Sequence, residues 1–154
     1  MAIERTLGII KPDAVAKNYT GKILAQIEDN NLRITASKMM RLTTEKAEKF
    51  YSEHLGQPFY SPLVEYMTSG PIIVKIFEGN NATTILRSIM GATSPSEAKD
   101  GTIRKLYGNH KLVNGTYENA MHGSDSIESA EREINFFFAS NESIKEQDEY
   151  TTKT

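Results

Sequence analysis

The chain has 154 residues, a formal net charge of −2 at pH 7 and no cysteine. Its length suits one domain with a sizeable hydrophobic core, and the lack of cysteine excludes disulfides, thiolate chemistry and cysteine-bound zinc. Lys and Arg are scattered along the chain, so the sequence offers no basic face for a specific nucleic acid or a membrane surface.

The sequence shows neither a signal peptide nor an apolar run long enough to cross a bilayer. We therefore expect a cytoplasmic protein without membrane attachment. No repeat or linker divides the chain, and we expect a single domain over residues 1–140 followed by a polar C-terminal tail over 141–154.

Strand-like apolar runs and helix-like stripes alternate in the first half of the chain. The predicted elements are a strand over 6–10, a helix over 21–30, a strand over 32–42, a helix over 43–55 and a short helix over 60–68. Thr43 or Thr44 is a suitable N-cap for the helix over 43–55. Pro12, directly after the first strand, is expected to end its ladder.

The second half begins with the clearest strand, the mostly apolar and β-branched run over 72–77. A helix over 81–90 follows, with Gly91 just past its end. The polar stretch from 92 to about 121 shows little periodicity except for a short helix over 102–107, and loops of such length are usually functional.

A short extended segment near His122 and a helix ending near Ala139 complete the pattern. The order of elements predicts an α+β fold: a ferredoxin-like split βαβ arrangement, with a four-stranded antiparallel sheet and surrounding helices.

The stretch over 119–126 places one histidine, His122, among short polar residues immediately before an amphipathic helix. Asp125 and Glu128 form a reasonable capping-box pair for that helix. A helix N-terminus attracts anions, phosphate above all. The imidazole could therefore be a general base, a metal ligand or a phosphate acceptor.

Glu133 bears on this choice because it lies eleven positions after His122, about three helical turns into the helix. If the helix folds back beside its leading strand, the Glu133 carboxylate could accept a hydrogen bond from one ring nitrogen. The other nitrogen would then be free to act as a nucleophile. The pattern alone favours an ordinary solvated glutamate.

Several motifs in order resemble the nucleoside diphosphate kinase family, from about residue 4 to residue 138. The central one is the signature from Asn119 through His122-Gly123-Ser124-Asp125. The supporting stretches lie at 4–6, 10–13, 66–71, 91–95 and 101–104. One such motif would be weak evidence, but several in the right order over one domain are strong evidence.

The resemblance implies a ping-pong transfer, in which a nucleoside triphosphate phosphorylates His122 and the phosphohistidine passes the group to a nucleoside diphosphate. A neutral imidazole is a good nucleophile near pH 7. Magnesium would enter on the nucleotide phosphates rather than in a protein cage. Phosphoryl transfer otherwise requires positioning and cations around the moving charge.

The resemblance also assigns site residues. Around His122 it implies catalytic contributions from Lys11, Tyr51, Ser124 and Glu133. For the nucleotide it implies Lys11, Arg87, Thr93 and Arg104 on the phosphates, Phe59 and Leu63 at the base, and Asn119 on the sugar hydroxyls. Base recognition by stacking discriminates little, so broad base specificity is expected.

Without the resemblance, each of these residues has an ordinary interpretation. The basic residues could be surface cations, the aromatic and aliphatic ones core residues, and Thr93 a turn residue. His54 and His110 have no motif around them and are interpreted as surface or packing residues.

The segment between Arg104 and His122 departs from the family pattern, being longer by about five residues within 105–118. Extra loop length costs well under about 1 kcal/mol by chain closure, so folding should survive. The segment is expected to border the nucleoside pocket. If it obstructs that pocket, the chain would instead be a nucleotide-binding or regulatory protein. Members of the family usually assemble, so we expect a homo-oligomer, a tetramer or hexamer built from dimers.

Overall fold

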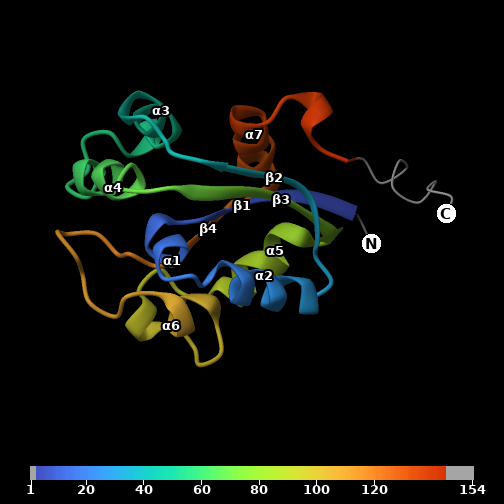
Figure 1. Ribbon diagram of the computed structural model, residues 1–154, viewed down its shortest axis with the longest axis horizontal. Helices are drawn as coiled ribbons and strands as arrows, with labels where there is room; N and C mark the ends of the chain where they lie inside the picture. Colours follow the sequence, from blue (N-terminus) through green and yellow to red (C-terminus); the bar gives the residue numbers. More distant parts are fainter. Residues whose placement is uncertain (1–2, 145–154) are drawn as a thin grey trace, which may run out of the picture.

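The computed structural model describes residues 3–144 as a four-stranded antiparallel sheet with helices on both faces (Figure 1). The strands are β1 (Ile3–Ile10), β2 (Arg33–Met40), β3 (Ile72–Asn80) and β4 (Met121–Gly123), in the spatial order β2-β3-β1-β4. This order is that of a split βαβ sheet, so the predicted fold class is confirmed.

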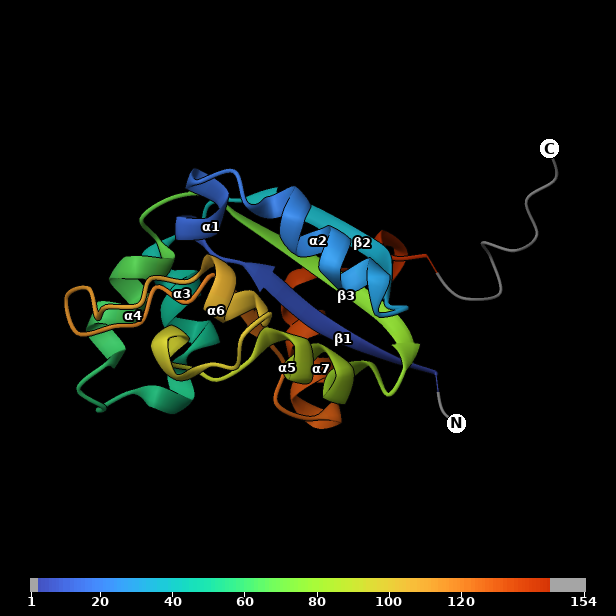
Figure 2. The ribbon, with the colours of Figure 1, turned by 90° about the horizontal axis from the view of Figure 1, so that it is seen from below.

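Seven α-helices surround this sheet in the described part of the chain. They are α1 (Pro12–Ala16), α2 (Thr20–Asp29), α3 (Thr44–Phe50), α4 (Tyr60–Met67), α5 (Ala82–Met90), α6 (Ile103–Tyr107) and α7 (Ile127–Phe137). Short 3₁₀ turns lie at Ser52–His54, Pro95–Glu97 and Ser140–Glu142. Helices α2, α5 and α6 lie on one side of the sheet, and α3 and α7 lie on the other (Figures 1 and 2).

The two central strands carry apolar side chains on both faces, because each face is covered by helices. Successive residues of a strand point to opposite sides. Accordingly, Leu7 and Ile9 pack in the core beneath α3, α4 and α7, whereas Ile10 and Phe77 pack in the core beneath α2 and α5. All four side chains are fully buried. The sheet is therefore a rigid platform between two apolar cores.

Helix α1 is not among the predicted elements, because Pro12 was expected only to end the first strand. Proline occupies the first turn of α1, where the missing N–H costs no helical hydrogen bond. Helix α1 thus starts directly at the end of β1, and Lys11 is its N-cap residue. The strand end and the helix start together fix the position of Lys11.

The predicted cap of the last helix is also wrong. Ser126, not Asp125, is the N-cap of α7, and its Oγ accepts a hydrogen bond of 3.1 Å from the Ser129 amide. Asp125 instead forms an ion pair with Arg87. Ile127, expected in the apolar stripe, is 58 % exposed because it falls in the first turn, outside the contact with the sheet.

The helix predicted over 43–55 also ends early, at Phe50, and gives way to the 3₁₀ turn. Thr43 is its N-cap, as the sequence indicated, with its Oγ1 accepting from the Lys46 amide.

Residues 140–144 contact the sheet rather than standing away from it. Lys38 forms an ion pair of 2.9 Å with Glu142, Arg5 donates to the Ser143 hydroxyl, and the Ile144 amide donates to the Thr35 carbonyl. The remainder of the predicted tail, 145–154, lies outside the described residues. No helix within residues 3–144 is both long enough and apolar enough to span a membrane.

Candidate active site

Strand β4 places His122 at the edge of the sheet. Its three residues pair with the end of β1, with His122 opposite Ile9, and the Ser124 amide then donates to the Leu7 carbonyl at 3.1 Å. Gly123 lies so close to α5 that an added Cβ would come within 2.5 Å of the Met90 sulfur. The backbone around His122 is therefore fixed from two sides.

The His122 ring is oriented by a buried carboxylate. Its Nε2 lies 2.8 Å from Glu133 Oε1, and the Ser124 hydroxyl donates to the same oxygen at 2.8 Å. Burial alone would raise the pKa of Glu133, but the hydrogen bonds from His122 and Ser124 outweigh it and the pKa is lowered. An ionised Glu133 accepts a hydrogen bond from Nε2–H, and the ring tautomer with its proton on Nε2 has a lone pair on Nδ1. The interpretation of Glu133 as a solvated glutamate is wrong, since only 7 % of it is exposed.

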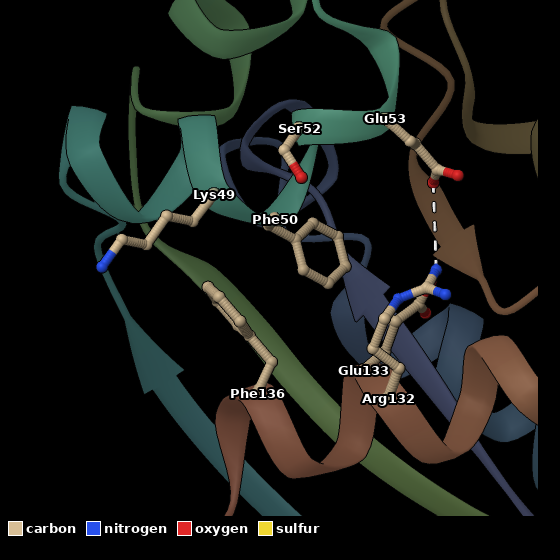
Figure 3. Close-up of a pocket in the computed structure, with 7 residues that line it drawn as sticks. All are labelled: Lys49, Phe50, Ser52, Glu53, Arg132, Glu133 and Phe136. Carbon is tan, nitrogen blue, oxygen red and sulfur yellow. Dashed lines mark ion pairs between the residues drawn. The ribbon is translucent and has the colours of Figure 1, made fainter.

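Phe50 holds the imidazole from another side. Its ring meets the His122 ring edge-on, with 5.5 Å between the ring centroids. Figure 3 shows Phe50 and Phe136 on the wall of a surface cavity of about 330 Å³ that Glu133 also lines. Across the same cavity, Arg132 of α7 faces Glu53 of the 3₁₀ turn at 3.9 Å. Helix α7 and the end of α3 thus enclose the carboxylate that orients His122.

Lys11 is a buried cation in a chain of hydrogen bonds. Its Nζ donates to Asn119 Oδ1 at 2.7 Å, and the Asn119 Nδ2 donates to the Thr93 carbonyl at 2.9 Å. Burial, and then repulsion from Arg104, lower the pKa of Lys11 to about 7, against partial compensation by Asp13. An anion that binds beside such a lysine stabilises the charged form of its side chain.

Arg104 is buried between two backbone carbonyls. One terminal nitrogen donates to the Gly91 carbonyl at 3.3 Å and the other to the Met121 carbonyl at 2.8 Å, whereas Nε has no partner among the described residues. Burial, followed by repulsion from Arg87, lowers the pKa of Arg104 to about 10. It remains a cation at neutral pH, and each terminal nitrogen keeps a second hydrogen for a ligand.

These residues border a cavity of about 350 Å³, which is also lined by residues of α4 and of the segment after α6. The predicted site residues that line it are Lys11, Tyr51, Phe59, Leu63, Thr93, Arg104, Asn119 and His122. Ser124 and Glu133 lie behind His122, as their hydrogen bonds require. Arg87 does not line the cavity; it donates to the Gly123 carbonyl and pairs with Asp125 at 3.2 Å.

One end of the cavity is apolar. Phe59 is 40 % exposed there, and the His54 ring packs against it with 5.1 Å between centroids. The Tyr51 hydroxyl is buried without a hydrogen-bond partner in residues 3–144, and burial raises its pKa. The other end is cationic, so the cavity suits a ligand with a planar apolar part and an anionic part.

Three further lining residues, Gly115, Thr116 and Tyr117, were not identified from the sequence. They belong to the longer segment after α6, which borders the cavity without filling it. The Asn114-Gly115 pair was the available signal, because this dipeptide is typical of a tight hairpin turn.

The donor set does not resemble a protein metal site. Residues 3–144 contain no group of three or more His, Asp or Glu side chains placed to hold a metal ion. The cavity presents cations instead. A divalent cation therefore fits this site only when it is coordinated by an anionic ligand that binds in the cavity.

An imidazole oriented by a carboxylate beside buried cations, in a cavity with an aromatic end, has the chemistry that phosphoryl transfer requires. The comparisons with known proteins agree. The family model "Nucleoside diphosphate kinase" matches residues 4–143. The chain therefore belongs to the nucleoside diphosphate kinase family, a family of phosphotransferases whose catalysis needs a divalent cation.

Curated relatives and solved structures give the same result. The chain is 53 % identical to the nucleoside diphosphate kinase of Halorhodospira halophila over 92 % of this chain and 97 % of the relative. It is 50 % identical to that of Persephonella marina, over 90 % and 96 %. The Aquifex aeolicus nucleoside diphosphate kinase structure matches with a TM-score of 0.86 and 43 % identity, covering 93 % of this chain and all of that one. The Halobacterium salinarum enzyme, solved in complex with CDP, matches with a TM-score of 0.83 and 34 % identity, over 99 % and 100 %.

Proposed function

We propose that His122 carries the nucleoside diphosphate kinase reaction as the group that is phosphorylated. The observation that supports this most directly is the hydrogen bond from Nε2 to the ionised Glu133, which leaves the Nδ1 lone pair free. Nδ1 attacks the terminal phosphorus of a nucleoside triphosphate, the bond to the bridging oxygen breaks, and the nucleoside diphosphate leaves. A second nucleoside diphosphate then takes the phosphoryl group from Nδ1 by the reverse displacement.

The cations hold the phosphates in this proposal. Lys11 exchanges its bond to Asn119 for a phosphate oxygen, and its lowered pKa rises again beside that charge. Arg104 offers its remaining guanidinium hydrogens while the Gly91 and Met121 carbonyls fix its plane. Thr93 lines the same end of the cavity, and Arg87 acts from beside Gly123.

The nucleoside occupies the other end of the cavity. Its base stacks on Phe59 with Leu63 alongside, and Asn119 contacts the sugar hydroxyls once Lys11 has turned to phosphate. Stacking accepts any base, which favours broad specificity among nucleoside tri- and diphosphates.

We propose magnesium as the divalent cation, bound to the nucleotide phosphates and water. Adding EDTA should abolish turnover without unfolding the protein, and excess magnesium should restore it. Unfolding on chelation, followed by circular dichroism, would point to a metal held by the protein itself.

We also propose that the chain acts as a cytoplasmic homo-oligomer built from dimers. Exposed apolar side chains such as Met39, Leu106 and Leu112 supply surface for self-association. Light scattering after gel filtration distinguishes a tetramer from a hexamer, and a monomer at micromolar concentration would contradict the proposal.

The test of the phosphohistidine uses purified protein, magnesium and ATP labelled at the γ-phosphate, without acceptor. Acid-labile, base-stable label should appear on the protein and move to GTP when GDP is added. His122→Gln should still bind ATP but take no label. Turnover retained by this variant would exclude His122 as the nucleophile.

A further inference from the structure

Tyr66 of α4 contacts the buried cation of the site and a buried carboxylate at the same time. Its ring faces the Lys11 ammonium, with Nζ 5.6 Å from the ring centroid. Its hydroxyl donates a hydrogen bond to Asp13 Oδ1. Burial, followed by the Asp13 carboxylate, raises the pKa of Tyr66, so the hydroxyl keeps its proton and acts as the donor. One side chain therefore contacts both members of a pair of opposite charges.

The two charges do not hydrogen-bond to each other, although only Pro12 separates them in the chain. Asp13 is 8 % exposed, and its Oδ2 has no hydrogen-bond partner among residues 3–144. The Lys11 ammonium donates to Asn119, a neutral acceptor, and has two further hydrogens. Opposite charges that are both removed from water attract each other strongly. The Tyr66 hydroxyl is the group that engages the carboxylate instead.

A direct bond between Lys11 and Asp13 would compete with the nucleotide. In the proposed function, the ammonium exchanges its bond to Asn119 for a bond to a phosphate oxygen. A carboxylate binds an ammonium group more strongly than an amide oxygen does, so it would be harder to displace. While the carboxylate is bonded to Tyr66, the ammonium keeps a partner that it can exchange easily.

We propose that Tyr66 is a positioning residue, which keeps Lys11 available to the nucleotide phosphates by holding the Asp13 carboxylate away from the ammonium. This inference rests on the proposed function, since it requires that Lys11 binds phosphate. The ring of Tyr66 supports the ammonium through its face, and the hydroxyl restrains the carboxylate. Tyr66 does not line the nucleotide cavity, so it acts through Lys11 rather than on the substrate.

The variant Tyr66→Phe separates the two contacts, because it keeps the ring and removes the hydroxyl. The released Asp13 carboxylate should pair with Lys11 and compete with ATP from within the protein. Formation of the phosphoenzyme is followed by rapid quench, with magnesium and γ-labelled ATP at a series of concentrations. We expect the ATP concentration for half-maximal rate to rise about tenfold. The maximal rate should change by less than about twofold, because saturating ATP displaces an internal competitor.

A second substitution, Asp13→Asn, removes the competing charge from the Tyr66→Phe protein. In this double variant the half-saturating ATP concentration should return to within about threefold of the wild-type value. A purely structural role of Tyr66 predicts no such rescue, since the double variant lacks two buried polar groups instead of one. Tyr60→Phe is the matched control, because it removes from the same helix a hydroxyl that donates to the Glu48 carbonyl. It should behave like the wild type.

Circular dichroism establishes that each variant is folded. An unchanged half-saturating concentration in Tyr66→Phe would overturn the inference, as would a tenfold rise that persists in the double variant. The double variant decides the matter even if the single variant does not fold, since a value near that of the wild type supports the inference and a tenfold rise contradicts it. If the folded wild type forms no phosphoenzyme, the proposed function fails instead.

Discussion

At the scale of single residues, the cavity contains buried charges whose desolvation cost a nucleotide would lower if it binds there as proposed. Lys11 and Arg104 are both nearly buried and both have a lowered pKa, because burial disfavours their charged forms. Glu133 shows the opposite balance, since its hydrogen bonds keep it ionised despite burial. In the proposed function, the free enzyme therefore already has its cations where the polyphosphate would bind.

Lys11→Met should stabilise the free enzyme at low pH. Below about pH 7 both the folded and the unfolded chain bind the Lys11 proton, and the wild type bears the full cost of the buried charge. Between about pH 7 and the ordinary lysine pKa, the unfolded chain binds a proton that the folded chain has released, so wild-type stability rises with pH relative to the variant. At pH 6 we expect the free energy of unfolding of the variant to exceed that of the wild type by about 1–3 kcal/mol. This difference should become smaller by pH 10.

Urea unfolding of both proteins, in the absence of nucleotide and at both pH values, measures this difference. An advantage that grows with pH would contradict the assignment of a lowered pKa to Lys11. The variant should in either case lose most of its turnover.

Glu133→Gln should slow phosphorylation of His122 by about a hundredfold or more, with little effect on ATP affinity. The amide can donate to Nε2 and so favour the ring tautomer with its proton on Nδ1, where the lone pair is needed. Ser124→Ala, which removes only one hydrogen bond to the carboxylate, should cost less. Rapid-quench measurement of the phosphoenzyme gives both rates, and a Glu133→Gln rate within twofold of wild type would show that the orientation is dispensable.

At the scale of elements, the ends of helices decide where functional groups lie. The start of α1 positions Lys11, and the strand-to-helix connection between β4 and α7 positions His122, Ser124 and Glu133 together. The Ser126 cap fixes the entry of α7, while Asp125 turns aside to pair with Arg87 at the surface.

Ser126→Ala should therefore destabilise the protein by about 1 kcal/mol, the usual cost of a lost N-cap. Asp125→Ala should cost no more than about 0.5 kcal/mol, because its ion pair with Arg87 is largely exposed. Thermal unfolding of the two variants side by side decides which residue caps the helix. A larger effect at Asp125 would support the cap predicted from the sequence.

The order of strands and helices could be predicted because it depends on local patterns, namely β-branched runs and helical stripes. Helix α1 could not be predicted, because a helix of five residues that begins with a proline is too short to show a periodic pattern. The site residues followed from the family signature rather than from pattern, and their roles remain proposals. The burial of Glu133 and the carbonyl partners of Arg104 depend on segments that meet only in the folded chain.

At the scale of the whole molecule, the boundary of the domain stays a prediction. The family match ends at residue 143, and residues 140–144 bind the edge strand β2 and Arg5. From these contacts we propose that the folded unit extends to residue 144 rather than ending at residue 140.

Two truncated chains test this boundary. A chain ending at Ala139 should unfold at a temperature several degrees below one ending at Ile144, because it loses the contacts of Glu142, Ser143 and Ile144. Calorimetry on both gives the difference directly. Equal unfolding temperatures for the two chains would support a domain boundary at residue 140.

The pairing of β4 with β1 has a consequence for amide hydrogen exchange. Edge strands often open locally, yet the His122 segment pairs with the buried half of β1 and packs against Met90 of α5. Its amides should exchange only when the whole domain unfolds, whereas the amides of Val113 and Thr116, which pair with each other in the segment after α6, should exchange through small local openings. His122 would then belong to the slowest-exchanging part of the molecule, and any motion that admits or releases a ligand would occur in the cavity walls around it.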